Sequence, residues 1–205
     1  AVFWRAFFNS STVFMAHIDS ALVRQQTFAW LNSVVVGLNL CPFAKPVISS
    51  ETLRIEVIDG SDHDSLARSF LAELDCLQQS DESEIATTLL VVPTGLESFE
   101  DYLDFVDLAN QLIEQVGLFG TLQLATFHPD YLFDGEPETA VSHFTNRSPH
   151  PILHLLREEM VEAAVASHPD PDAIPNNNIA RLEQLGREQV AALLQRALHS
   201  SSENG

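Results

Sequence analysis

The middle of the chain alternates between strand-like and helix-like segments, and this alternation constrains the fold more than any other feature. Short stretches rich in β-branched and apolar residues lie at 52–59, 86–92 and 121–127, separated by helix-like stretches at 62–79 and 98–116. Strands that alternate with helices of this length are typical of crossover connections in a parallel sheet. We therefore expect an α/β domain with a small, largely parallel or mixed sheet of at least three strands.

Helix-like patterns flank this region on both sides. Apolar residues recur at steps of three and four between 21 and 38, which predicts a helix with one buried face. Two further helices are expected near the C-terminus, at 149–166 and at roughly 178–199. The predicted helices would pack around the sheet.

Length and cysteine content limit the organisation of the chain. Its 205 residues, 45% of them hydrophobic, can bury one core of ordinary size. We expect one domain over 15–199, an extension outside the fold at 1–14 and a disordered tail at 200–205. The two cysteines form no C-x-x-C pair or disulfide framework, which is typical of a protein in the reducing cytoplasm.

The charge balance restricts the partners. The 29 acidic and 10 basic side chains give a net charge of −19, which repels phosphate backbones and anionic lipid headgroups. No apolar run approaches the roughly 18 residues that a membrane span needs. We therefore expect neither nucleic acid nor a membrane as partner.

The ends of the predicted strands hold the first candidate site. In a parallel sheet the carboxyl ends of the strands meet at one edge, and ligands bind in the crevice outside it. Thr94 lies at the end of the second strand, and His128 and Asp130 follow the third on either side of a proline. An imidazole beside a carboxylate could act as general acid or base. Alternatively, Asp130 caps a turn and His128 is a polar residue at the sheet edge.

The segment before the predicted 149–166 helix is a candidate anion site. Ser148 is a natural N-cap, and Asn146 and Arg147 stand just ahead of it. A helix N-terminus offers free amide donors and the positive end of the helix dipole, so a carboxylate or phosphate would fit there. Arg147 could instead pair with one of the many surface acids.

The same predicted helix places His150, His154 and Arg157 on one face. Histidines four residues apart can bind a metal, although this pair lacks the glutamate of an H-E-x-x-H motif. Arg157 could face an anion. Further along, Asn177 either helps to cap the last helix or contacts a ligand.

Cys41 follows an apolar helical pattern and stands beside a proline, with Lys45, the only lysine of the chain, four residues on. A neighbouring cation favours a thiolate, so Cys41 could be a reactive thiol. It could also bind a metal, or simply pack, because free cysteine is among the most buried residue types.

Four stretches together resemble a bacterial and plastid family known as domain of unknown function 1415: VVGLNLCPFAKP, ATTLLVVPTGLESFEDYLDFV, ATFHPDYLFDG and TNRSPHPILHLLREE. The resemblance covers about residues 26–186. It implies one domain over that range and implies no activity.

Three functions remain open. In the leading hypothesis the protein is a small-molecule enzyme: Cys41 is a nucleophile or redox-active thiol, His128 and Asp130 supply acid–base chemistry, and the arginines hold an anionic substrate. In the second, zinc or iron is bound by Cys41, His128, Asp130 and His154. In the third, the protein is a binding or regulatory module without catalysis. No nucleotide-binding motif occurs.

Overall fold

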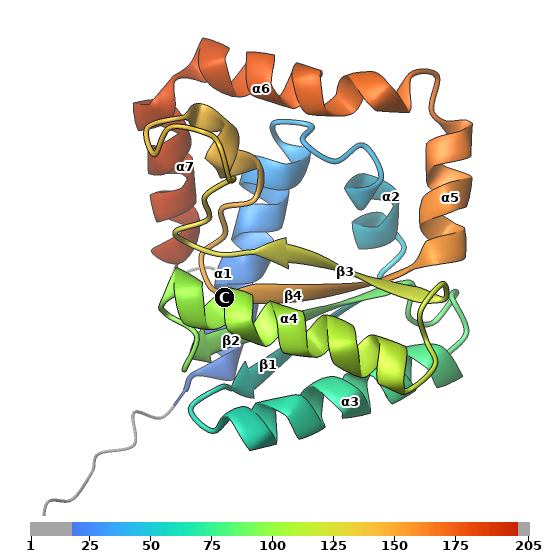
Figure 1. Ribbon diagram of the computed structural model, residues 1–205. Coiled ribbons are helices and arrows are strands. Elements are labelled where there is room, and N and C mark those ends of the chain that lie inside the picture. Colours follow the sequence, from blue (N-terminus) through green and yellow to red (C-terminus); the bar gives the residue numbers. More distant parts are fainter. Residues whose placement is uncertain (1–17, 201–205) are drawn as a thin grey trace, which may run out of the picture.

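The computed structural model describes residues 18–200, which form an α/β fold around a four-stranded mixed sheet (Figure 1). The strands are β1 (Leu53–Asp59), β2 (Thr87–Thr94), β3 (Leu122–Phe127) and β4 (Ile152–Arg157), in the order β1-β2-β4-β3. β1 and β2 are parallel, and β4 runs antiparallel to both of its neighbours. The predicted fold class is confirmed. The expected extension at 1–14 and nearly all of the expected tail lie outside the described residues.

Two crossover helices connect the first three strands. α3 (His63–Gln79) joins β1 to β2, and α4 (Phe99–Gln115) joins β2 to β3. α4 begins where the sequence predicts, since the Ser98 side chain accepts a hydrogen bond from the Asp101 N–H. β1, β2 and β3 therefore run in the same direction. The expected crossovers between parallel strands are confirmed, although only β1 and β2 are neighbours, because β4 is inserted between β2 and β3.

The predicted helix at 149–166 is wrong in its first half. Residues 152–157 form β4, and only α5 (Glu158–Ser167) is helical. β4 is a central strand, so its side chains are covered on both faces and apolar residues do not alternate with polar ones. Such a run fits a helical stripe equally well, since Ile152, Leu155 and Leu156 also lie at helical spacing.

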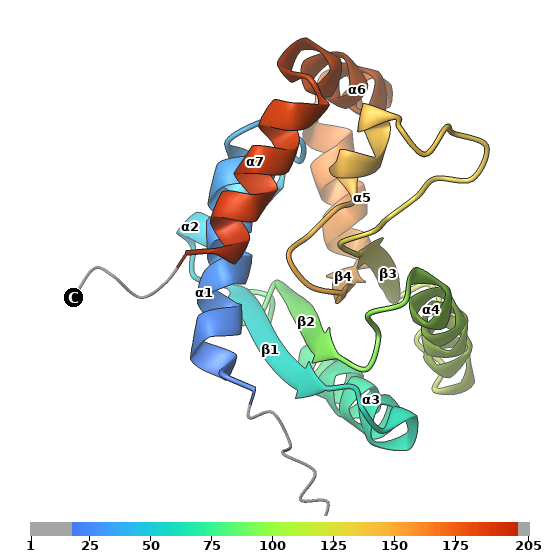
Figure 2. The same cartoon turned by 90° about the vertical axis from the view of Figure 1, so that its left-hand side faces the viewer.

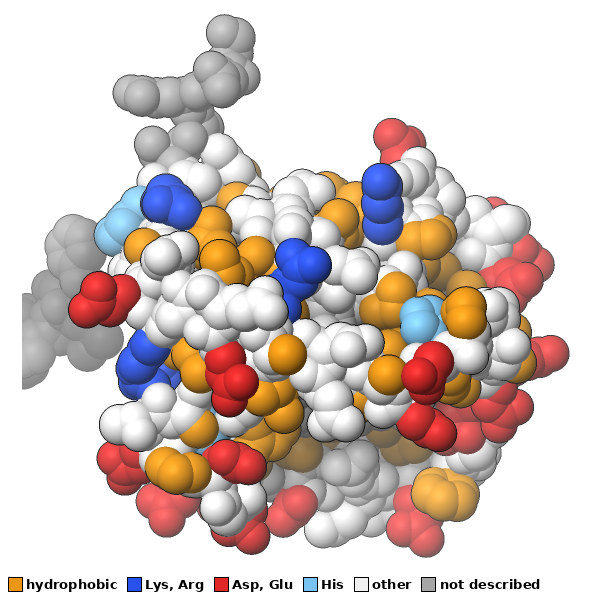
Figure 3. Space-filling model, turned by 90° about the horizontal axis from the view of Figure 1, so that it is seen from above, with side chains coloured by type: hydrophobic (Ala, Val, Ile, Leu, Met, Phe, Trp, Pro, Cys, Tyr) orange, Lys and Arg blue, Asp and Glu red, His pale blue; other side chains and the backbone are white. Residues whose placement is uncertain are grey.

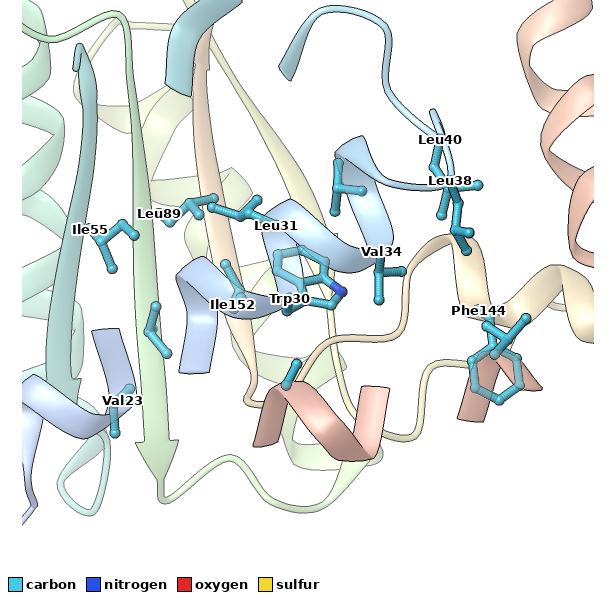
Figure 4. Packing of buried hydrophobic residues seen from close by; sticks show 14 of the residues in the cluster. Val23, Trp30, Leu31, Val34, Leu38, Leu40, Ile55, Leu89, Phe144 and Ile152 are labelled. Atoms are coloured by element: carbon cyan, nitrogen blue, oxygen red, sulfur yellow. The ribbon is translucent and has the colours of Figure 1, made fainter. Parts of the chain in front are cut away.

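The helices form a separate hydrophobic core on each face of the sheet (Figure 2). α3 and α4 cover one face. The other face is covered by α1 (Ser20–Trp30), a π-helical continuation η1 (Leu31–Val36), the short α2 (Ala44–Ser49) and α7 (Arg187–Leu198). Trp30 lies within this second cluster, near Leu31 and Ile152 (Figure 4).

The predicted helix at 178–199 is two helices, α6 (Ile174–Leu185) and α7. Gly186 separates them with a φ of 78°, a left-handed conformation that favours glycine. Two 3₁₀ turns, η2 (Val141–Thr145) and η3 (Pro171–Ala173), complete the elements. None of the helices within the described range is long and apolar enough to cross a bilayer.

Candidate functional site: a two-arginine pocket

The turn after β3 and the segment before β4 lie against each other at the carboxyl edge of the sheet. The His128 N–H donates to the Asn146 carbonyl (3.1 Å), and the Ser148 N–H donates to the His128 carbonyl (3.4 Å). The Asn146 side chain also donates to the Thr126 carbonyl (2.9 Å). The structure thus brings together two of the segments that the sequence singles out.

The His128 ring is held entirely by backbone groups. Its Nδ1 accepts from the Asp130 N–H (3.0 Å), so this nitrogen carries no proton. Its Nε2 lies 3.0 Å from the Leu96 carbonyl oxygen, which can only accept, so Nε2 carries the proton. The ring is buried, and burial lowers its pKa. The expected acid–base pair is therefore wrong in its geometry, because Asp130 contacts His128 through its backbone rather than its carboxylate.

Tyr102 of α4 connects β3 and β4 by hydrogen bonds at the same end of the sheet. Its hydroxyl donates to the Ile152 carbonyl (2.7 Å) and accepts from the Phe127 N–H (3.0 Å), two residues that face each other across β4 and β3. Burial raises the pKa of this hydroxyl strongly, so it keeps its proton at neutral pH. The ring also lies 5.0 Å from that of His128.

A cavity of about 240 Å³ opens between these segments and α7. Its polar lining comprises Asp130, Arg147, Ser148, Arg187 and Gln195, and its apolar lining includes Phe144, Pro149, Leu194 and Leu198. Both arginines lie against one ring, since their Cζ atoms are 4.9 Å and 5.7 Å from the centroid of Phe144. We call this cavity the two-arginine pocket.

Within the described residues, the only hydrogen bonds of the two guanidinium groups are to backbone carbonyls. In the described part of the chain, neither forms an ion pair with a carboxylate. Arg147 donates from Nε to the Tyr131 carbonyl (3.2 Å), and its own carbonyl accepts from the Trp30 indole (3.0 Å). Burial and the charge of Arg187 both lower the pKa of Arg147. An anion between the two guanidinium groups would relieve this repulsion.

Ser148 and Arg147 do not form the predicted helix start, because β4 follows instead. Ser148 is buried, and its hydroxyl donates to the His150 carbonyl (2.6 Å). His150 and His154 likewise do not share a helix face. His150 Nε2 lies 2.7 Å from the Gln26 side-chain oxygen, and His154 Nε2 lies 2.7 Å from the Thr87 hydroxyl.

Arg157 is a structural residue at the opposite edge of the sheet. Its guanidinium donates to the carbonyls of Leu77 (2.6 Å), Ser80 (2.7 Å) and Ile85 (3.0 Å). The first two belong to the end of α3, where helical carbonyls lack partners within the helix. The expectation that Arg157 faces an anion is therefore wrong.

Cys41 lies in the loop before α2 and packs against the hydrophobic core on the α1 side of the sheet. Burial raises the pKa of its thiol and outweighs the backbone N–H groups of Phe43 and Ala44, which favour the thiolate. Lys45 is exposed. The environment of Cys41 is therefore that of a packed thiol and not of an activated one.

The remaining candidates lie outside the two-arginine pocket. The Thr94 hydroxyl donates to the Asp59 carboxylate (2.8 Å) at the ends of β2 and β1. Asn177 lines a separate cavity of about 350 Å³ with Asn39 and Arg181.

The four metal-ligand candidates do not converge. Within residues 18–200, no three His, Cys, Asp or Glu side chains gather closely enough to hold one metal ion. Cys41 packs on the α1 side of the sheet, whereas the His128 ring lies 5.2 Å from Phe99 of α4. His154 points its Nε2 at Thr87. These residues therefore offer no joint site for zinc or iron.

Sequence reasoning missed Phe144, Arg187 and Gln195. Arg187 stands directly after Gly186, and a glycine within a helical pattern signals a possible break. That break starts α7 at Arg187 and places its side chain beside Arg147 and Phe144. No signal in the sequence pairs α7 with the segment before β4.

A family model described as "Protein of unknown function (DUF1415)" matches residues 22–192. The chain belongs to this family. The matched range includes the strands, α3, α4 and most of the two-arginine pocket. Comparisons with the curated proteins and with the solved structures gave no match. Membership of the DUF1415 family assigns no activity, so function is argued from the pocket.

Proposed function

We propose that this DUF1415 protein binds a small oxyanion, such as a carboxylate, in the two-arginine pocket. One observation carries the proposal: Arg147 and Arg187 converge on the Phe144 ring, and neither is ion-paired within residues 18–200. Arginine presents a planar set of donors that matches a carboxylate in two-point contact.

Two arginines at one cavity are unexpected in a chain with so few basic residues. Only ten Lys and Arg residues oppose 29 acids, yet two of the ten meet at one cavity. On the face shown in Figure 3, acidic side chains gather along the lower and right-hand rim, and most basic ones lie away from it among hydrophobic atoms. The net charge of −19 disfavours a polyanion such as nucleic acid and leaves a small anion as the suitable ligand.

Binding without a chemical step fits the site better than catalysis does. Both ring nitrogens of His128 are occupied by backbone groups, and burial disfavours the thiolate of Cys41. A general base needs a free lone pair within reach of the substrate proton. The proposed role is therefore that of a binding or regulatory protein.

The test is isothermal titration of the full chain with sodium 4-methylpentanoate and, separately, with inorganic phosphate. Arg187→Gln is the first variant to test, because the residue is exposed and, besides its contact with the Phe144 ring, makes one long hydrogen bond of 3.4 Å to the Glu138 carbonyl. Arg196→Gln is the matched control: it lies on the same helix, changes the charge equally and is outside the pocket.

We expect binding of at least one probe, weakened about tenfold or more by Arg187→Gln, as is typical for loss of a charge-assisted hydrogen bond. Arg147→Gln should act in the same direction, with melting temperature as a check on folding. The proposal is wrong if neither probe binds, or if Arg196→Gln weakens binding as much as Arg187→Gln does.

A further inference from the structure

The two-arginine pocket also contains one carboxylate, and this group narrows the ligand class. Asp130 lines the cavity with Arg147 and Arg187 but forms no ion pair with either one within residues 18–200. Its negative charge nevertheless acts on Arg147, whose pKa it raises while Arg187 lowers it. Side chains of opposite charge therefore line one small cavity without forming an ion pair within the described residues.

The backbone of Asp130 is held in place by the fold. Its N–H donates to Nδ1 of the buried His128 ring, and the His128 carbonyl accepts from the Ser148 N–H. His128 is in turn anchored to the Leu96 carbonyl. The backbone that carries the carboxylate is thus tied to the segment that carries Arg147. A backbone held in this way can bind a ligand without losing much loop freedom.

An apolar wall completes the pocket. α7 contributes Ala191, Leu194 and Leu198, which lie on the same side of the helix as Arg187. Pro129 and Pro149 face them from the segments around the sheet edge. The cavity volume of about 240 Å³ is below the range of about 300–1,000 Å³ that is common for drug-sized ligands. The ligand is therefore small and partly apolar.

We infer that the ligand is a small zwitterion with an apolar side chain, of the chemical class of the aliphatic α-amino acids. Its carboxylate lies between the guanidinium groups of Arg147 and Arg187, its ammonium group faces the carboxylate of Asp130, and its side chain packs on the apolar face of α7. This inference rests on the proposed function and adds a second charge to the ligand.

Three probes of nearly equal size separate the two charges. L-Leucine carries both, 4-methylpentanoate lacks the ammonium group, and 3-methylbutylamine lacks the carboxylate. Each is titrated calorimetrically into the full chain, up to millimolar concentration, and into Asp130→Asn. Asp134→Asn, an exposed residue of the same loop outside the pocket, is the matched control for the change in charge. Asp130→Asn should fold, because the structural bond of Asp130 comes from its backbone N–H.

We expect L-leucine to bind at least about tenfold more tightly than either truncated probe, since each loses one charge-assisted contact. Asp130→Asn should abolish the preference for L-leucine over 4-methylpentanoate, and Asp134→Asn should leave it intact. If 4-methylpentanoate binds as tightly as L-leucine and Arg187→Gln weakens both, the anion site stands and the zwitterion inference is wrong. The inference is also wrong if the Asp130→Asn protein still prefers L-leucine over 4-methylpentanoate. If none of the three probes binds, or if the amine binds best, the zwitterion inference is wrong. The proposed anion site is also wrong if, in addition, neither 4-methylpentanoate nor inorganic phosphate binds.

Discussion

The hydroxyl of Tyr102 should be among the most important single polar groups for stability. It is fully buried and bridges the Phe127 N–H and the Ile152 carbonyl where β3 and β4 meet. Tyr102→Phe removes both bonds and leaves a donor and an acceptor without their partner. A buried polar group that loses its partner costs about 1–3 kcal/mol, so we expect the free energy of unfolding to fall by about 2–5 kcal/mol.

The assay is equilibrium unfolding in urea, followed by circular dichroism and analysed by linear extrapolation. Tyr131→Phe is the matched control: it deletes the same atom, but its hydroxyl makes only one long contact, 3.3 Å to the Thr126 hydroxyl. We expect the control to change stability by less than about 1 kcal/mol. A Tyr102→Phe protein within about 0.5 kcal/mol of the parent would refute the reasoning, because it would show that the two strands close and bond directly.

Three further predictions concern partly buried side chains. Arg157→Met should lower the unfolding free energy by about 2–4 kcal/mol by leaving backbone carbonyls unpaired, whereas Arg68→Met at the surface should change it by under about 0.5 kcal/mol in the same urea assay; equal effects would contradict this. Burial lowers the pKa of His154 to about 4. Between about pH 6.5 and 4 the unfolded chain therefore binds a proton that the folded chain does not. As the pH decreases through this window, the free energy of unfolding should decrease by at most about 3 kcal/mol. His154→Gln should make that part of the pH profile shallower, and an unchanged slope would contradict the assignment. Cys41 should react with iodoacetamide at pH 7 no faster than Cys76, and faster labelling would restore the reactive-thiol hypothesis.

Local patterns in the sequence predict much of this fold, because they reflect contacts within one element. The helix that begins after Ser98 and the strands at 52–59 and 86–92 follow from capping and from runs of β-branched residues. The segment at 152–157 is the instructive failure. Its apolar residues are buried by elements distant in sequence on both faces of the sheet, and periodicity cannot separate such a strand from a helix.

The site was predictable only in part for a related reason. Position after a strand marks His128 and Asp130 as residues at the sheet edge, and the sheet does bring them beside Asn146 and Arg147. The state of a ring such as that of His128 depends on which backbone groups point at its nitrogens, and no sequence pattern records that. Arg187 enters the pocket through the packing of α7, which is a tertiary contact.

The most direct test of the account follows the arginine side chains themselves. In ¹H–¹⁵N spectra, the Nε–Hε resonances of Arg147 and Arg187 should shift and saturate as sodium 4-methylpentanoate is added. Those of Arg68 and Arg196, which lie outside the pocket, should remain in place. Equal shifts of all four arginines, or no shift at Arg147 and Arg187, would contradict an anion site at the two-arginine pocket.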